Sequence, residues 1–230
     1  MIPYGKHSID DDDIASVVSV LKSDWLTQGP WVPRFEDALA SFCHVQYSVA
    51  VNSATSALHI ACLALGVGDK DLVWTSPNSF VASANCARFC GADIDFVDIE
   101  QDTGNMCMDA LHDKLETACA AKQLPKVVIP VHFSGQPCNM KRLHNLAEKY
   151  GFSIIEDASH AVGARYNDKM IGSCQYSDIC VFSFHPVKII TSLEGGMAMT
   201  NSVDLARSMR LARSHGVTSQ KESMDREADG

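Results

Sequence analysis

The sequence predicts an α/β protein with a mainly parallel central sheet flanked by helices. Short runs of apolar, often β-branched residues alternate with segments of helical periodicity from Tyr47 to Asp157. Several of the helical segments stop at a glycine, namely Gly66, Gly91 and Gly151. Strands that alternate with such helices are typical of βα units, whose strands run parallel.

The N-terminal segment, residues 1–45, is expected to be helical and to belong to the same domain. Ser8 and a cluster of aspartates precede apolar residues at helical spacing, which predicts a capped helix over residues 8–23. A loop rich in breaker residues follows at 27–30, and a short second helix is predicted around Phe35.

The alternating region and the part beyond it give the remaining elements in chain order. Strands are predicted over residues 47–51, 72–75, 94–97, 127–131, 153–156, 179–182 and 197–200. Helices are predicted over residues 53–65, 79–90, 108–120, 140–150 and 203–212, and a small hairpin over 164–171. We assign residues 1–216 to one large domain, and we expect the polar residues 217–230 to form a tail or a loop.

Composition is that of a soluble globular protein and argues against several function classes. The 230 residues are 46% hydrophobic and carry a formal charge of −9 without a Lys/Arg run, which argues against a nucleic-acid or anionic-membrane surface. Neither a bilayer-spanning apolar segment nor a signal-peptide layout is present, so a cytoplasmic protein is expected. The nine cysteines and nine histidines lack metal-site spacing, which favours reduced thiols and no metal.

Polar residues follow the predicted strands at the edge where parallel sheets bind ligands. Ser53 starts a helix directly after a strand, which suits a phosphate, although simple N-capping is the favoured interpretation of Ser53 taken alone. Asp157 ends a buried strand and is either a site carboxylate or a turn residue. Phe80 is either a ring-stacking side chain or part of the core.

Lys188 lies just beyond a buried strand that breaks at Pro186. At the edge of an apolar core its amine would be desolvated, which lowers the pKa and prepares a lysine to attack a carbonyl. A solvated loop lysine is the alternative interpretation of Lys188 taken alone.

A set of motifs carries a family resemblance. The motifs are SATSALH (53–59), SFVASAN (79–85), GQP (135–137), EDASHAVGA (156–164), and SFHPVK followed by EGG (183–196). Together they resemble the DegT/StrS-type nucleotide-sugar aminotransferases, which are pyridoxal-phosphate enzymes of the aspartate-aminotransferase fold (fold type I). The resemblance runs from about Tyr4 to Gly216, and the SFHPVK wording is most similar to the branch that aminates a 4-keto sugar in pseudaminic acid biosynthesis.

The resemblance implies a role in cofactor binding or catalysis for individual residues. Lys188 would form a Schiff base with pyridoxal phosphate and move the proton during transfer, and Asp157 would pair with the pyridinium nitrogen. Phe80 would stack on the ring, and His160 would approach its phenolic oxygen. The phosphate would be held by Ser53, Ala54, Thr55 and Ser183.

The implied reaction is a ping-pong transfer of an amino group from an amino acid, usually glutamate in this family, to the C4 keto group of a UDP-4-keto-6-deoxy-HexNAc. A homodimer with shared sites is implied as well. Two alternatives stay open, which are an aminotransferase for another nucleotide-linked keto sugar and a non-catalytic binding or regulatory protein that keeps the fold. A sugar dehydratase is opposed by Lys188, because relatives with that activity carry histidine there.

The sequence departs from the family pattern in two respects. Leu193 stands where relatives commonly have glycine, and Ile189 stands where they often carry proline or asparagine; a leucine at positive φ would be strained or shift the loop. Relatives also continue into a small C-terminal domain. We therefore expect the chain to be a fragment with exposed apolar surface that is poorly soluble or inactive alone.

Overall fold

Helices and strands alternate along residues 5–217, the part of the chain that the computed structural model describes. The helices are α1 (Asp11–Leu21), α2 (Trp31–Cys43), α3 (Ala54–Ala64), α4 (Ala82–Phe89), α5 (Met108–Ala121), α6 (Met140–Tyr150) and α7 (Val203–Arg213). The strands are β1 (Tyr47–Val51), β2 (Leu72–Thr75), β3 (Asp93–Phe96), β4 (Val127–Ile129), β5 (Ser153–Asp157), β6 (Arg165–Tyr166), β7 (Lys169–Met170), β8 (Ile179–Ser183) and β9 (Gly196–Thr200), with a short 3-10 turn, η1, at Phe133–Gly135. Of the predicted tail at 217–230, everything after Val217 lies outside the described residues.

A mixed seven-stranded sheet forms the middle layer, in the order β1-β9-β8-β5-β4-β2-β3. Neighbouring strands run parallel except at β9, which pairs antiparallel with both β1 and β8. The predicted α/β fold with a mainly parallel sheet is therefore confirmed. Strands β6 and β7 form the separate predicted hairpin.

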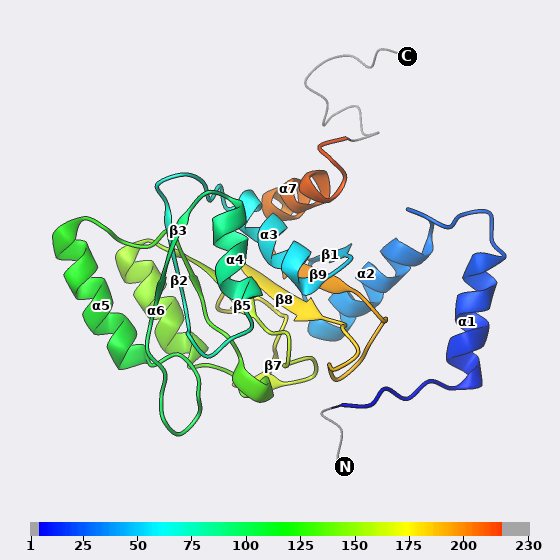
Figure 1. Ribbon diagram of the computed structural model, residues 1–230, viewed down its shortest axis with the longest axis horizontal. Helices are drawn as coiled ribbons and strands as arrows, with labels where there is room; N and C mark the ends of the chain where they lie inside the picture. The colour runs from blue at the N-terminus through cyan, green and yellow to red at the C-terminus, as the bar shows by residue number, and fades with distance from the viewer. Residues whose placement is uncertain (1–4, 218–230) are drawn as a thin grey trace.

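Helices cover both faces of this sheet (Figure 1). On one face, apolar residues of α3, α4 and α7 pack on alternate residues of the strands, such as Val181 of β8. On the other face, α5 and α6 cover β2, β4 and β5, while α2 covers β8 and β9, where Cys180 and Phe182 point. Alternation along β8 thus separates two apolar cores and leaves only its carboxyl end free for polar chemistry.

Helix α1 begins later than the sequence suggests, because its N-cap is Asp10 and not Ser8. The Asp10 side chain accepts the backbone N–H of Asp13 at 2.9 Å, and the Asp13 side chain accepts the backbone N–H of Asp10 at 3.1 Å. This reciprocal capping box satisfies both donors. Helix α1 buries none of its residues and stands away from the sheet layers in Figure 1.

Helix α4 also begins later than predicted, at Ala82. The hydroxyl of Ser79 lies 2.6 Å from that of Ser83, and the backbone N–H of Asn85 donates to Val81. The segment before Ala82 is a turn, so Phe80 precedes the helix and does not open it. The other predicted boundaries differ from the observed ones by a few residues at most.

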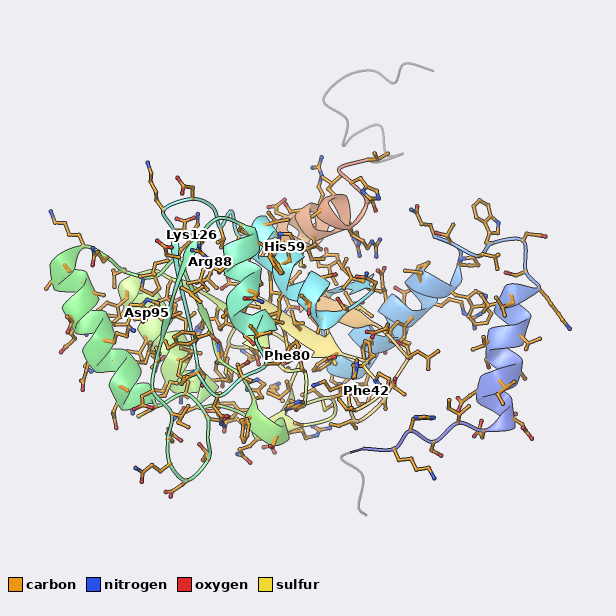
Figure 2. The ribbon with its side chains drawn as sticks, in the orientation of Figure 1. Phe42, His59, Phe80, Arg88, Asp95 and Lys126 are labelled. Atoms are coloured by element: carbon orange, nitrogen blue, oxygen red, sulfur yellow. The ribbon has the colours of Figure 1, made fainter. Side chains whose placement is uncertain are left out.

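Charged side chains are paired at the edge of the sheet where the parallel strands begin. Lys126, which precedes β4, lies 2.8 Å from Asp71, which precedes β2. Lys126 is drawn well away from Phe80 in Figure 2. Partly exposed pairs of this kind contribute roughly 0–1 kcal/mol each. The opposite edge, where the strands end, holds the residues that the sequence singled out.

Gly196, the first residue of β9, joins three segments at that edge. It pairs with Val51 of β1 and with Ser183 of β8. A Cβ at Gly196 would lie 2.4 Å from the backbone carbonyl of Ser53 and 2.5 Å from the backbone nitrogen of Ala54. Only glycine lets the start of α3 lie directly on the sheet. Among the described helices, none is long and apolar enough to cross a membrane.

Replacing Gly196 by alanine should destabilise the protein by about 2 kcal/mol or more, because the opposing atoms are backbone and cannot turn aside. Thermal unfolding followed by circular dichroism measures this. Gly68→Ala is the matched control, since a Cβ at Gly68 meets no atom within 4 Å. An unchanged Tm for Gly196→Ala would contradict the contact.

Candidate active site

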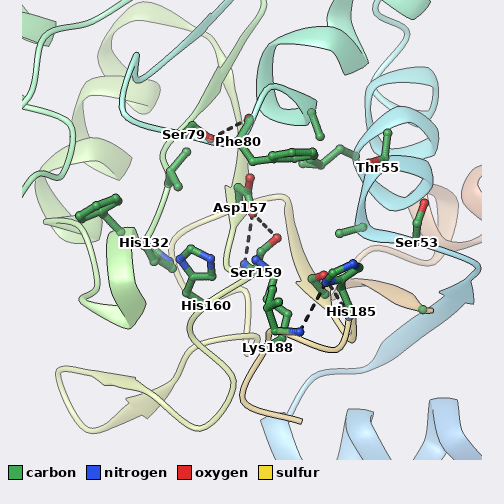
Figure 3. A pocket seen from close by; sticks show the side chains of 18 of the residues that line it. Ser53, Thr55, Ser79, Phe80, His132, Asp157, Ser159, His160, His185 and Lys188 are labelled. Carbon is green, nitrogen blue, oxygen red and sulfur yellow. Dashed lines mark hydrogen bonds between the residues drawn. The ribbon is translucent and has the colours of Figure 1, made fainter. Parts of the chain in front are cut away.

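A cavity of about 470 Å³ opens at the carboxyl edge of the sheet. Pockets for small ligands usually occupy roughly 300–1,000 Å³. The cavity is bordered by the ends of β5 and β8, by the start of α3 and by the turn before α4 (Figure 3). All of the predicted site residues line it, namely Ser53, Ala54, Thr55, Phe80, Asp157, His160, Ser183 and Lys188.

The start of α3 forms one side of the cavity. Ser53 has an extended backbone, and its hydroxyl oxygen accepts the N–H of Ser56 at 3.1 Å, so Ser53 is the N-cap of α3. The first N–H groups of a helix have no acceptor within the helix, and the positive end of its dipole attracts anions. The first turn of α3 can thus both be capped by Ser53 and present the N–H groups of Ala54 and Thr55 to an anion.

Asp157 is the buried carboxylate at the end of β5. One oxygen, Oδ2, accepts the Ser83 hydroxyl at 2.6 Å. The other, Oδ1, accepts the Ser159 hydroxyl at 2.6 Å and the Ser159 backbone N–H at 3.2 Å. These donors fix the orientation of a carboxylate that is only 5% exposed.

Lys188 is half-buried in the turn after β8. Its backbone N–H donates to the carbonyl of His185 at 2.9 Å, and the backbone N–H of Phe184 donates to Gly195 at 3.0 Å. Burial lowers the pKa of the Lys188 amine, and the nearby Asp157 carboxylate partly opposes that change. The pKa shift has the direction that a nucleophilic lysine needs.

His160 borders the same cavity close to Lys188. Burial lowers the pKa of its imidazole, the positive charge of Lys188 lowers it further, and Asp157 opposes both. The neighbouring turn explains the GQP motif, because Gly135 has φ +86° and a Cβ there would lie 2.7 Å from the backbone oxygen of His160. The backbone of Gly135 thus supports the segment that carries His160.

The cavity has an exposed side at Phe80 and a half-buried side at Lys188. Phe80 is 73% exposed and lies opposite Lys188 in Figure 3, with Asp157 on one flank and Ser53 and Thr55 on the other. A flat group in this space would have an aromatic ring on one side and the lysine on the other. Phe80 is therefore not part of the core.

Several polar residues near the cavity were not assigned a role from the sequence. Ser83 and Ser159 hold Asp157, and each lies within a motif that the family resemblance uses. His132 is fully buried beneath the cavity, where Nε2 lies 2.8 Å from Glu156. Its Nδ1 accepts the backbone N–H of Cys138, so the proton on Nε2 is donated to Glu156. No spacing rule connects these partners, because they come from different elements.

Comparison with solved structures places this fold among the aminotransferases. Helicobacter pylori PseC, an aminotransferase involved in the biosynthesis of pseudoaminic acid, matches with a TM-score of 0.85 and 33% identity, over 95% of this chain and 57% of that chain. The PLP form of the putative sugar aminotransferase Spr1654 from Streptococcus pneumoniae matches with a TM-score of 0.82 and 29% identity, over 91% of this chain and 57% of that one.

The chain belongs to the DegT/DnrJ/EryC1/StrS aminotransferase family, whose model matches residues 7–228. The UDP-4-amino-4,6-dideoxy-N-acetyl-beta-L-altrosamine transaminase of Campylobacter jejuni subsp. jejuni serotype O:23/36 is 41% identical over 222 residues, which are 96% of this chain. The chain spans 57% of the length of that relative.

Leu193 adopts φ +69°, so the position does require the left-handed conformation. This conformation costs a non-glycine residue about 1–2 kcal/mol. We expect Leu193→Gly to leave the protein equally stable or up to about 1 kcal/mol more stable, because the strain relieved is offset by the entropy of glycine in the unfolded chain. Leu193→Val, which is β-branched, should be less stable than both. Urea unfolding measures the order, and a valine variant as stable as the glycine variant would contradict it.

The pKa of His160 should respond in opposite directions to its two charged neighbours. Lys188→Met removes a positive charge and should raise the pKa of His160, whereas Asp157→Asn removes a negative charge and should lower it. NMR titration of the His160 ring signals in the cofactor-free protein measures both. Shifts of the same sign in the two variants would show that His160 does not sense these charges.

Proposed function

We propose that the protein to which this chain belongs is a pyridoxal-phosphate-dependent sugar aminotransferase. The observation that carries the proposal is the convergence of Lys188, Asp157 and the first turn of α3 on one cavity. Pyridoxal phosphate carries an aldehyde, which a lysine can bind, and a ring nitrogen, which a carboxylate can pair with. Its phosphate can be held by a helix start.

The residues present fit this cofactor. Ser183, at the end of β8, lines the cavity together with Thr55 of α3, so two hydroxyls accompany the helix N–H groups where a phosphate would lie. Asp157 is buried and oriented, as a partner for a protonated ring nitrogen must be. Phe80 offers an exposed ring face for stacking. The matched Streptococcus pneumoniae protein has been solved in PLP and PMP forms.

When bound, pyridoxal phosphate supplies an electron-poor ring that stabilises negative charge on the carbon beside the transferred nitrogen. Lys188 Nζ would hold the cofactor covalently and, once released, take a proton from one carbon and return it to another. Its lowered pKa increases the fraction of amine that is free to accept that proton. Asp157 would accept a hydrogen bond from the ring nitrogen and keep it protonated.

His160 would act beside the phenolic oxygen of the cofactor. Because burial and Lys188 both lower its pKa, the neutral imidazole is favoured. A neutral imidazole donates one hydrogen bond and accepts another, so His160 can orient an oxygen without adding a second full positive charge near Lys188.

The proposed substrates are an amino-acid donor, L-glutamate by the family resemblance, and the C4 keto group of a UDP-4-keto-6-deoxy-HexNAc. The support for the sugar is the 41% identity to the Campylobacter jejuni transaminase and the fold shared with Helicobacter pylori PseC. Another nucleotide-linked keto sugar is the alternative acceptor. Turnover on a panel of UDP-4-keto-6-deoxy sugars tests the choice, and turnover of only differently linked sugars would reject it.

A homodimer is also proposed. Large apolar side chains are exposed at Phe80, which lines the cavity, and at Ile189 and Leu193, which adjoin the lining residues Lys188 and Glu194 in sequence; their exposures are 73%, 63% and 66%. A second copy covering them would remove this surface from water, at roughly 25 cal/mol per Å². Light scattering of the full-length protein tests the dimer, and a monomer at micromolar concentration would contradict it.

Borohydride reduction of the full-length protein with pyridoxal phosphate should attach the cofactor to Lys188, detected by mass spectrometry of the digested protein. Lys188→Ala should lose the label and lower kcat by about 10²- to 10⁴-fold or more, because the nucleophile and the proton carrier are both removed. Lys169→Ala, at an exposed position of β7, is the matched control and should behave as the wild type. A folded wild type without label on Lys188 would leave only a non-catalytic role for the fold.

A further inference from the structure

Ser83 is a fully buried hydroxyl inside α4 that reaches across the cavity wall to Asp157. It is 0% exposed, and its Oγ lies 2.6 Å from Asp157 Oδ2 although the two residues are 74 positions apart. The hydroxyl of Ser79, which lines the cavity, lies 2.6 Å from Ser83 Oγ. The three side chains form a continuous hydrogen-bonded row from the cavity wall to the carboxylate.

The direction of the hydrogen bonds in this row follows from the chemistry of the groups. An ionised carboxylate only accepts hydrogen bonds, so the single hydroxyl proton of Ser83 is donated to Asp157. The Ser83 oxygen can then only accept from Ser79, whose hydroxyl lies 2.6 Å from it and also 3.1 Å from the carbonyl of Phe80. Because its proton is donated to Asp157, the Ser83 hydroxyl does not also donate to the carbonyl of Phe80, which lies farther away at 3.3 Å.

The row also limits which acceptor positions of Asp157 stay open. A carboxylate offers about four lone-pair positions. Ser83 occupies one on Oδ2, while the hydroxyl and the N–H of Ser159 occupy two on Oδ1. About one position stays available to a group in the cavity that Asp157 lines.

We infer that Ser83, supported by Ser79, is a positioning residue that holds Asp157 so that its remaining acceptor position faces the cavity and selects an N–H donor. This inference rests on the proposed function, in which the donor is the protonated ring nitrogen of pyridoxal phosphate. Without the Ser83 hydroxyl, the Asp157 carboxylate could rotate about its side-chain bonds. The hydrogen bond from the ring nitrogen to Asp157 would then be less well aligned.

The test uses full-length protein loaded with pyridoxal phosphate that carries ¹⁵N in the ring. In Ser83→Ala the ring nitrogen signal should move toward the deprotonated value, and the Kd for the cofactor should rise about 10-fold, as is typical when a residue that orients a binding group is removed. Ser83→Thr, which keeps the hydroxyl, should restore both. Ser79→Ala should move the signal in the same direction by less.

Ser76→Ala is the matched control. Ser76 is a buried serine at the end of β2, and its hydroxyl has no hydrogen-bond partner in the described part of the chain. Its replacement should leave the nitrogen signal and the Kd unchanged. If Ser83→Ala does not fold, Ser83→Cys fills the space with a weak donor and should shift the signal as described.

The outcomes separate this inference from the proposed function. A wild type without bound cofactor, or an Asp157→Ala variant whose ring nitrogen signal equals that of the wild type, would reject the proposed function. A normal signal in Ser83→Ala together with a shifted signal in Asp157→Ala would overturn only the role of Ser83. A Ser83→Thr variant that resembles Ser83→Ala would also overturn it, since the hydroxyl would then not be the cause.

Discussion

The site depends on the close contact between Gly196 and the start of α3. Strand β9 lies between β1 and β8, so the helix that follows β1 must cross a strand to reach the residues at the end of β8. It can do so because Gly196 has no side chain, which lets the backbone of Ser53 and Ala54 approach the sheet. A single absent methyl group thus brings the start of α3, the proposed anion site, next to Ser183.

Local elements could be predicted from the sequence because their signals are local. Periodicity predicted α3, α5 and α6 to within a few residues, and glycines marked the ends of α3 and α6. The antiparallel direction of β9 could not be predicted, since Met197 to Thr200 are equally suited to either direction and the pairing is decided by distant strands. At α1 several capping residues competed, and Asp10 prevails because Asp13 returns its hydrogen bond.

The predicted site residues all line one cavity, and their individual roles remain predictions. Their proximity could be predicted from the sequence because each follows a strand, and parallel strands end at one edge of the sheet. Ser83 gave no such signal. A serine among alanines in a helix usually serves only as a small residue that packs closely. The role of Ser83 depends on its hydrogen bond to Asp157, which is 74 residues away. His132 and Glu156 were missed for the same reason, as they meet only after β4 and β5 pair.

The protonation of Lys188 and His160 in the cavity is governed by burial more than by any one charge pair. Burial is the largest cause of the lowered pKa of both Lys188 and His160, whereas Asp157 acts against it in both cases. The two bases therefore respond together to the depth of the cavity. Water entering beside Phe80 would raise the pKa values of both Lys188 and His160. A positive charge on either base would in turn disfavour protonation of the other. A partner that covered Phe80 would exclude water and keep Lys188 closer to its neutral form, so the proposed dimer contact and the chemistry of the lysine are physically linked.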